Sequence, residues 1–241
     1  QDISKLNACL LPGNWKKCWD NIYNKYGPAV IEIPICGSWL YPNFIEIISE
    51  LSKQHNLIIK SNLSKDMRDF CEQIDSSKVK IIPIFHPIFA GIDTFVQNAK
   101  LLQEKGFISN IHYLAYPPQI KLIESYKKKF DFEKLPLSMM IFWGNYNGVE
   151  YPIGYTDEEK NIINNYLDDN LKRKFQLLFE QGFKKDQCLA GKNYAVINAD
   201  GSVSKCLDSE GIIGNFFDKD FKMIDQEIAC NVERCRKDEK E

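Results

Sequence analysis

Two patterns of apolar and polar positions alternate along the first two thirds of the chain. Apolar residues at helical spacing predict helices over 15–26, 44–51, 93–105 and 119–130, and another that begins at Thr156. Five apolar runs of strand length lie between or after these helices, at 29–35, 57–61, 79–85, 110–116 and 137–143. Runs that are apolar on both faces are typical of buried parallel strands joined by right-handed crossovers. The pattern therefore predicts an α/β fold with five parallel strands in a sheet or partial barrel.

Polar residues and glycine follow several of the predicted strands directly. Cys36, Gly37 and Ser38 follow the first strand, Asn62 the second and His86 the third. Ligands of parallel α/β folds bind at the carboxyl ends of the strands, so these residues are candidates for cofactor or substrate binding. Purely structural roles remain the alternative, with Cys36 and His86 packed at strand ends and Asn62 in a turn. We expect Tyr116 and residues 143–146 to line the same edge, where their aromatic side chains would suit a peptide substrate.

The pattern changes near residue 185, after a charged stretch that predicts a helix and a connector. The segment NYAVINA, the dipeptide Asp200-Gly201 and the segment SVSKC predict a strand, a tight turn and a second strand. We therefore expect a domain over 1–185 and a small module over 186–241.

Four of the eight cysteines fall in this small module, at Cys188, Cys206, Cys230 and Cys235. The predicted hairpin would bring the first two together, and the last two have nearly the spacing of a metal knuckle. Four thiolates suit zinc or an iron–sulfur cluster, and the spacing does not separate the two metals. Buried free thiols and a disulfide are the alternatives.

The cysteine segment also carries a resemblance to a known family. The pattern C-x-x-G-x-x-Y-x-x-I-x-x-D-G-x-V-x-x-C, from Cys188 to Cys206, resembles the auxiliary-cluster module of radical SAM enzymes, known as twitch or SPASM. The α/β alternation resembles the partial (β/α)6 barrel of that superfamily, which binds S-adenosylmethionine. The resemblance implies an auxiliary [4Fe–4S] cluster on Cys188, Cys206, Cys230 and Cys235.

Two further segments fit the same superfamily. AVIEIPICGSWLYPNF resembles its second strand and the following loop, where I-x-x-GGEP-x-x-YP is usual, and SNLS resembles the turn after its third strand. The resemblance implies that the loop containing Cys36, Gly37 and Ser38 contacts the cofactor. Gly37, however, stands where the family has an acidic residue, and the chain has no C-x3-C-x2-C motif for the cluster that binds S-adenosylmethionine.

These departures leave two hypotheses and leave enzymatic activity open. In the first, the first strand and cluster motif lie upstream of Gln1, and the intact enzyme generates a 5′-deoxyadenosyl radical that modifies a peptide or small substrate. S-adenosylmethionine would then be its cofactor. In the second, the protein is an inactive pseudoenzyme that acts as a binding or partner subunit, and its four-cysteine site is structural.

Composition narrows the choice of partners and compartment. The 241 residues have a net charge of −2, which argues against nucleic acid or an anionic membrane as the main partner. No apolar stretch approaches the ~20 residues of a membrane span, and the polar opening QDISKLN is unlike a signal peptide. We therefore expect a cytoplasmic protein that meets a peptide or small-molecule substrate, with an electron donor or partner subunit as a further candidate.

Overall fold

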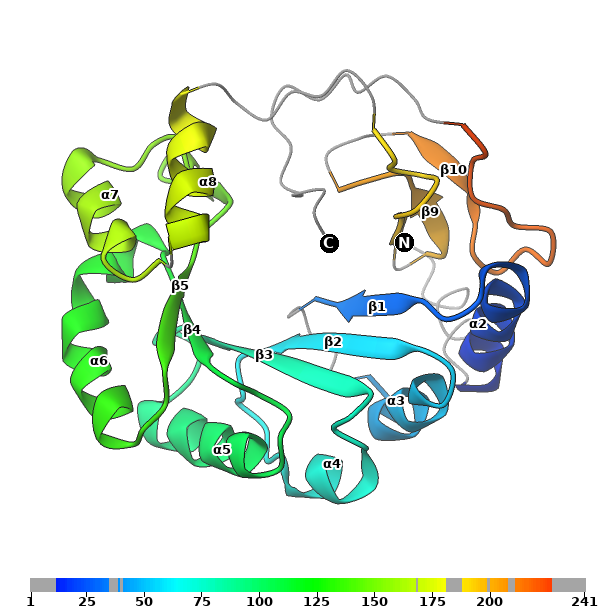
Figure 1. Ribbon diagram of the computed structural model, residues 1–241, viewed down its shortest axis with the longest axis horizontal. Helices are drawn as coiled ribbons and strands as arrows, with labels where there is room; N and C mark the ends of the chain where they lie inside the picture. Colours follow the sequence, from blue (N-terminus) through cyan, green and yellow to red (C-terminus); the bar gives the residue numbers. More distant parts are fainter. Residues whose placement is uncertain are drawn as a thin grey trace. The chain divides into compact units, whose positions relative to one another are not determined.

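The computed structural model describes residues 12–34, 39, 41–167, 169–180, 188–198, 200–207 and 211–226. Contacts within the chain divide it into two compact units (Figure 1). We call residues 26–172 the sheet unit. We call residues 12–25, together with the described residues from 173 onward, the hairpin unit. Cys36, Gly37, Ser38, Cys230 and Cys235 lie outside the described residues.

The sheet unit contains a five-stranded parallel sheet in the order β1-β2-β3-β4-β5. Its strands are β1 (Val30–Ile33), β2 (Asn56–Ser61), β3 (Val79–Phe85), β4 (Ile111–Leu114) and β5 (Leu137–Met140). Each strand lies within or almost within one of the five predicted runs, so the predicted α/β class with parallel strands is confirmed. Neighbours in the sheet are also neighbours in the sequence, as expected for repeated strand–helix–strand connections.

Helices α3 to α6 cover one face of this sheet (Figure 1). The helices of the unit are α3 (Phe44–Ser52), α4 (Arg68–Gln73), α5 (Ile92–Glu104), the 3-10 helix η2 (Pro117–Leu122), α6 (Ile123–Phe132) and α7 (Asp157–Asn164). The predicted capping box begins α7, where Thr156 Oγ1 accepts from Glu159 N at 3.2 Å and Glu159 Oε2 accepts from Thr156 N at 2.8 Å. A short antiparallel hairpin, β6 (Gly144–Tyr146) and β7 (Val149–Tyr151), follows β5.

The two faces of the sheet differ in burial. Toward the helices, strand residues such as Leu57, Ile59 and Tyr113 are at most 1% exposed, and Phe85 at the end of β3 packs against the rings of Phe95 on α5 and Phe130 on α6. On the opposite face, the alternate strand residues Ile58, Ile82, Leu114 and Met140 are only half-buried. The strands are therefore not buried equally on both faces, although their apolar runs suggested this.

The hairpin unit is built on a smaller antiparallel sheet in the order β10-β9-β8. Its strands are β8 (Val196–Ile197), β9 (Ser202–Ser204) and β10 (Ile212–Asn215). As the sequence predicts, β8 and β9 pair antiparallel about Asp200-Gly201. The turn closes through a hydrogen bond from Gly201 N to Asn198 O at 2.9 Å, and Gly201 has a φ of 82°.

Helix α2 (Pro12–Tyr26) packs against this small sheet, and α8 (Asp169–Glu180) begins at the end of the sheet unit. The Trp15 and Trp19 rings lie 5.7 and 5.0 Å from the Phe216 ring, and Cys18 is buried in the same cluster. The predicted apolar face of α2 is confirmed, but the sequence did not indicate that its partner lies near the other end of the chain. The boundary between residues 185 and 186 stays a prediction. None of the described helices is long and apolar enough to cross a membrane.

Candidate functional site

The loop after β2, which contains the predicted site residue Asn62, has a tightly specified conformation. Ser61 is 1% exposed, and its Oγ accepts hydrogen bonds from Leu63 N at 3.0 Å and from Trp39 Nε1 at 2.8 Å. Leu63 is fully buried with a φ of 51°, a left-handed conformation that a leucine adopts only when its surroundings enforce it. Asn62 Oδ1 accepts from Ser64 N at 3.2 Å, so its turn role is observed and its ligand role stays a prediction.

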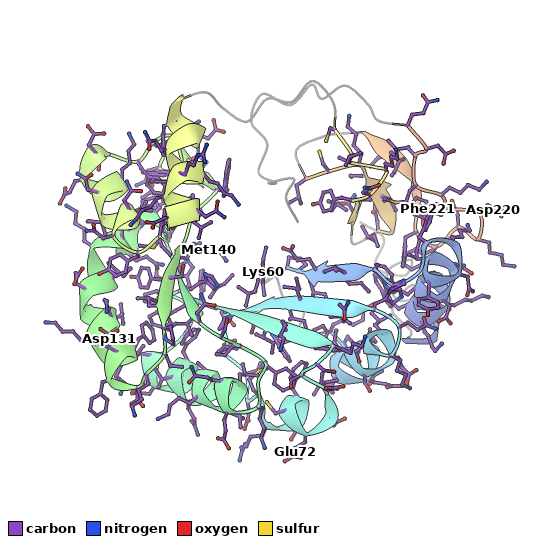
Figure 2. The ribbon with its side chains drawn as sticks, in the orientation of Figure 1. Lys60, Glu72, Asp131, Met140, Asp220 and Phe221 are labelled. Carbon is purple, nitrogen blue, oxygen red and sulfur yellow. The ribbon has the colours of Figure 1, made fainter. Side chains whose placement is uncertain are left out.

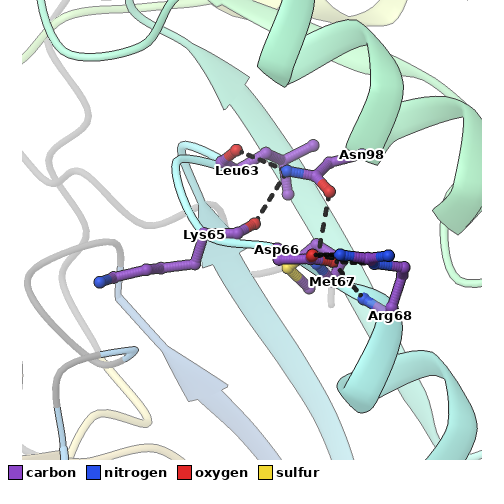
Figure 3. Close-up of polar contacts among 6 residues, drawn as sticks. All are labelled: Leu63, Lys65, Asp66, Met67, Arg68 and Asn98. Carbon is purple, nitrogen blue, oxygen red and sulfur yellow. Dashed lines mark hydrogen bonds and ion pairs between the residues drawn. The ribbon is translucent and has the colours of Figure 1, made fainter.

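Asn98 on α5 holds the same loop from the opposite side (Figure 3). Its Nδ2 donates to Leu63 O at 3.0 Å and to Lys65 O at 2.8 Å, and its Oδ1 accepts from Met67 N at 3.3 Å. Asn98 is 6% exposed, so these bonds satisfy backbone groups that are largely shielded from water. The loop therefore presents Asn62 from a rigid support at the carboxyl edge of the sheet.

His86, the next predicted site residue, directly follows β3 and lies among aromatic rings. Its ring centre is 4.5 Å from that of Phe89 and 5.3 Å from that of Tyr116. Its Nδ1 is buried and has no hydrogen-bond partner among the described residues. Burial lowers the pKa of His86, which favours a neutral imidazole near pH 7. A neutral imidazole with an unused ring nitrogen can exchange a hydrogen bond with a ligand.

The loops after β4 and β5 add aromatic side chains to this edge, as the sequence predicts. The Tyr116 ring lies 5.0 Å from Phe142 and 5.2 Å from Tyr146. Tyr155 ties the two loops together, since its hydroxyl donates to Ala115 O at 2.6 Å and accepts from Phe142 N at 3.1 Å. Burial raises the pKa of Tyr155, so the hydroxyl stays protonated and keeps both bonds. We call His86, Tyr116, Phe142 and Tyr146 the aromatic edge.

Sequence reasoning missed three polar residues one layer below this edge. Glu32 on β1, Lys60 on β2 and His112 on β4 lie on the face of the sheet away from the helices, where Glu32 is exposed and the other two are partly buried. Glu32 and Lys60 form an ion pair. The signal that could have found them is a charge inside an otherwise apolar strand, because a strand buried on both faces rarely holds an ionised side chain.

In the hairpin unit, the segments that contain Cys188 and Cys206 lie close together. Gly191 has a φ of 89°, and a Cβ at this position would lie 2.6 Å from Ile224 Cδ1 and 3.2 Å from Lys205 Cβ. The turn after Cys188 therefore packs against the residue that precedes Cys206, and only glycine fits there. This contact explains the glycine of the C-x-x-G pattern.

The cysteine environment is compatible with a thiolate ligand as far as the described residues extend. Cys188 Sγ accepts a hydrogen bond from Ala190 N at 3.4 Å, which fixes the direction of the thiol. Both Cys188 and Cys206 are partly exposed free thiols. The described residues contain no group of three metal-binding side chains, and two of the four predicted ligands, Cys230 and Cys235, lie outside them. The four-cysteine site therefore stays a prediction.

Comparison with known proteins identifies the fold through structure rather than sequence. No family model and no curated protein matches the chain. The structure of anSMEcpe with bound AdoMet matches with a TM-score of 0.60 and 14% identity over 87% of this chain and 69% of that chain. The same protein with AdoMet and the Cp18Cys peptide matches with a TM-score of 0.58 and 13% identity, over 87% and 70%.

SuiB from Streptococcus suis, bound to S-adenosylmethionine, matches with a TM-score of 0.59 and 15% identity. This match covers 87% of the present chain and 57% of SuiB. Both neighbours were solved with S-adenosylmethionine bound, and the chain shares their fold. At such low identity the likeness concerns the fold alone.

Proposed function

We propose that the chain is a radical SAM-type protein with an incomplete (β/α) barrel and a twitch-like iron–sulfur module, and that it acts on a peptide. The observation that carries this proposal is the structural match over 87% of the chain to an enzyme with bound AdoMet. The aromatic edge adds support, because it lies at the carboxyl ends of the parallel strands, where ligands of such folds bind.

The proposed peptide lies along the aromatic edge. The Tyr116 and Tyr146 rings, 5.2 Å apart, offer apolar faces to a peptide side chain, and the His86 ring centre lies 5.3 Å from that of Tyr116. Asn98 fixes the neighbouring loop before the peptide arrives, which reduces the entropy lost on binding. The peptide in the structure of anSMEcpe with Cp18Cys is consistent with this substrate class.

The proposed auxiliary [4Fe–4S] cluster is held by Cys188, Cys206, Cys230 and Cys235. When bound, such a cluster supplies electron transfer or a ligand position for substrate. The chain's own contribution is to hold the thiolates. The Ala190 N–H fixes the direction of the Cys188 thiol, and Gly191 lets the turn after Cys188 approach Lys205. Zinc on the same four thiolates is the alternative occupant.

A specific observation favours a second candidate function, an inactive binding subunit. Gly37 stands where the family has an acidic residue in the loop after its second strand, which removes both a charge and a hydrogen-bond acceptor. The 241 residues also contain no C-x3-C-x2-C motif. We therefore propose radical generation only for a protein that contains the C-x3-C-x2-C motif. Peptide binding and the four-cysteine site need no such motif and are proposed for the 241 residues themselves.

The test is anaerobic purification of the chain, followed by iron, sulfide and zinc analysis and an absorbance spectrum. We expect broad absorbance near ~400 nm and about four irons with matching sulfide per chain. About one zinc per chain and no colour would instead support a structural site and the binding subunit. A folded protein with neither metal would show that the four-cysteine proposal is wrong.

A further inference from the structure

An ion pair on the half-buried face of the sheet has no part in the proposed peptide or cluster sites. Glu32 is the penultimate residue of β1 and Lys60 the penultimate residue of β2, so both lie one layer below the carboxyl edge. Glu32 is paired in register with Ile58, two residues before Lys60, which places both side chains on the same face. Lys60 lies on the side of β2 away from α3 and α4 (Figure 2).

The environment of this pair is apolar, and it is only partly open to water. The Lys60 side chain is 31% exposed and that of Glu32 is 51% exposed. Most neighbouring positions on this face are aliphatic or thioether side chains: Ile58, Ile82, Ile84, Leu114 and Met140. The exception is Lys80, which is in register with Ile58, is exposed and donates to Gly106 O at 2.8 Å. In contrast, the described strand residues that face the helices include no charged side chain. The charged residues of the five parallel strands, Glu32, Lys60 and Lys80, therefore all lie on the face away from the helices.

His112 extends this polar group toward β4. It is paired in register with Ile84, whereas Lys60 is paired with Ile82, so His112 lies one row further along the same face than Lys60. Burial lowers the pKa of His112, and the positive charge of Lys60 lowers it further. The imidazole is thus neutral near pH 7 and within electrostatic reach of the Lys60 ammonium, where it can exchange a hydrogen bond with a bound anion.

We propose that Glu32 and Lys60 form a receptor for an α-amino acid zwitterion with an aliphatic side chain. The ligand ammonium binds the Glu32 carboxylate, the ligand carboxylate binds the Lys60 ammonium, and the aliphatic side chain covers Ile82 and Leu114. No covalent step is involved. The site is distinct from the aromatic edge and from the cysteines, so the proposal does not rest on the proposed function.

The reason for choosing a zwitterion is charge balance. A ligand with one charge must break the Glu32–Lys60 pair, which leaves either the exposed Glu32 carboxylate or the partly buried Lys60 ammonium without its counterion. A zwitterion replaces one ion pair by two and leaves the net charge of the site at zero. The site therefore favours ligands that carry both an ammonium and a carboxylate group over ligands that carry only one of these groups.

The first test compares three ligands of the same shape by isothermal titration calorimetry with the full chain. The probes are L-leucine, 3-methylbutylamine, which lacks the carboxylate, and 4-methylpentanoate, which lacks the ammonium. We expect L-leucine to bind at least about tenfold more tightly than either analogue. Equal affinities for the three probes, or no binding of L-leucine at millimolar concentration, would overturn the proposal.

The second test uses two variants that should change the preference between the two singly charged probes in opposite directions. Glu32→Gln should weaken L-leucine binding and shift the preference toward 4-methylpentanoate, since Lys60 loses its internal partner. Lys60→Gln should weaken L-leucine binding and shift the preference toward 3-methylbutylamine. A purely structural ion pair would not produce this exchange of preference, so equal weakening of all three probes would contradict the receptor.

Lys100→Gln is the matched control, because Lys100 and Glu133 form an ion pair at 2.7 Å elsewhere in the sheet unit. It should leave all three affinities unchanged.

If a Glu32 or Lys60 variant does not fold, the comparison of the three probes on the unaltered chain still tests the proposal. The metal analysis tests a different proposal. If the chain binds L-leucine but contains no iron, the receptor proposal stands and the cluster proposal is wrong. If the chain contains iron but does not bind L-leucine, the cluster proposal stands and the receptor proposal is wrong.

Discussion

The two units of the chain are stabilised in different ways. In the sheet unit, helices cover one face of a five-stranded sheet, and rings such as Phe85, Phe95 and Phe130 are fully buried against one another. In the hairpin unit, three strands of two to four residues share a cluster whose buried members are Cys18, Val203, Phe216 and Phe221. The first unit has enough apolar burial to fold around its own core, whereas the second depends on aromatic contacts with α2 and on turns with special backbone geometry.

This difference suggests what the cysteines contribute. A small module with a limited core gains most from a metal that joins distant segments. The sheet unit has its own buried core, and polar interactions such as those of Asn98 position its loops. Substitutions in each unit can test this contrast. The largest expected effect is loss of a metal, and the smallest is a shallow pH dependence of the free energy of unfolding.

The largest effect is expected for Cys206→Ser. Loss of one of four thiolates should remove the metal and expose the backbone of the hairpin unit, while the sheet unit keeps its structure. Metal analysis and hydrogen exchange resolved along the sequence would measure both effects. Cys71→Ser in α4 is the control, because it removes a thiol of the sheet unit and should leave the metal content unchanged. A Cys206→Ser chain that keeps its metal would refute the site.

The next effect concerns the turn between β8 and β9. An alanine Cβ at Gly201, where φ is 82°, would lie 2.3 Å from carbons of the Phe217 ring. We expect Gly201→Ala to destabilise the hairpin unit by about 3 kcal/mol, through the left-handed backbone and the displaced ring. Gly27→Ala is the matched control, since Gly27 has a φ of 80° but nothing within 4 Å of the added Cβ, and should cost about 1 kcal/mol.

Hydrogen exchange would again assign these losses to one unit or the other. Equal losses for the two glycine variants would mean that Phe217 moves aside freely. The tight packing inferred for the hairpin unit would then be wrong.

A smaller effect is expected at the loop that Asn98 supports. Asn98→Ala leaves Leu63 O, Lys65 O and Met67 N without their side-chain partner, and we expect a loss of about 2 kcal/mol in the free energy of unfolding. Asn62→Ala removes one exposed turn bond and should cost less than about 0.5 kcal/mol. Chemical denaturation would measure both values, and an Asn98 variant as stable as the Asn62 variant would contradict the support role.

The smallest effect is a pH dependence of the sheet unit. Burial lowers the pKa of His112 in the folded state, so the unfolded chain takes up a proton at higher pH than the folded chain does. The free energy of unfolding should therefore fall as the pH drops below about 6.5, the ordinary histidine value, and stay level above it. His112→Gln should flatten this slope in part, with the remainder due to His86, whose pKa burial also lowers. An unchanged slope in the variant would exclude His112 as a source.

Much of the fold could be predicted from local patterns. The five strands, the capping box at Thr156 and the hairpin about Asp200-Gly201 all depend on residues that are close in the sequence, and the structure confirms each. The candidate site was predicted in part. His86 and Tyr116 were found because they follow strands, whereas the roles of Asn62 as a ligand and of Cys188 and Cys206 as metal ligands stay predictions.

The positions of the five parallel strands and of most helices follow from the sequence alone, because apolar periodicity and turn residues act over a few positions. Helix α4 and the hairpin of β6 and β7 were not predicted. The sheet face that the helices cover is a property of the folded chain, and so is the grouping of Glu32, Lys60 and His112 on the half-buried face. The same is true of the packing of Trp15 and Trp19 against Phe216, about two hundred positions away in the chain. Such contacts depend on strand register and side-chain complementarity between distant segments, which no local pattern encodes.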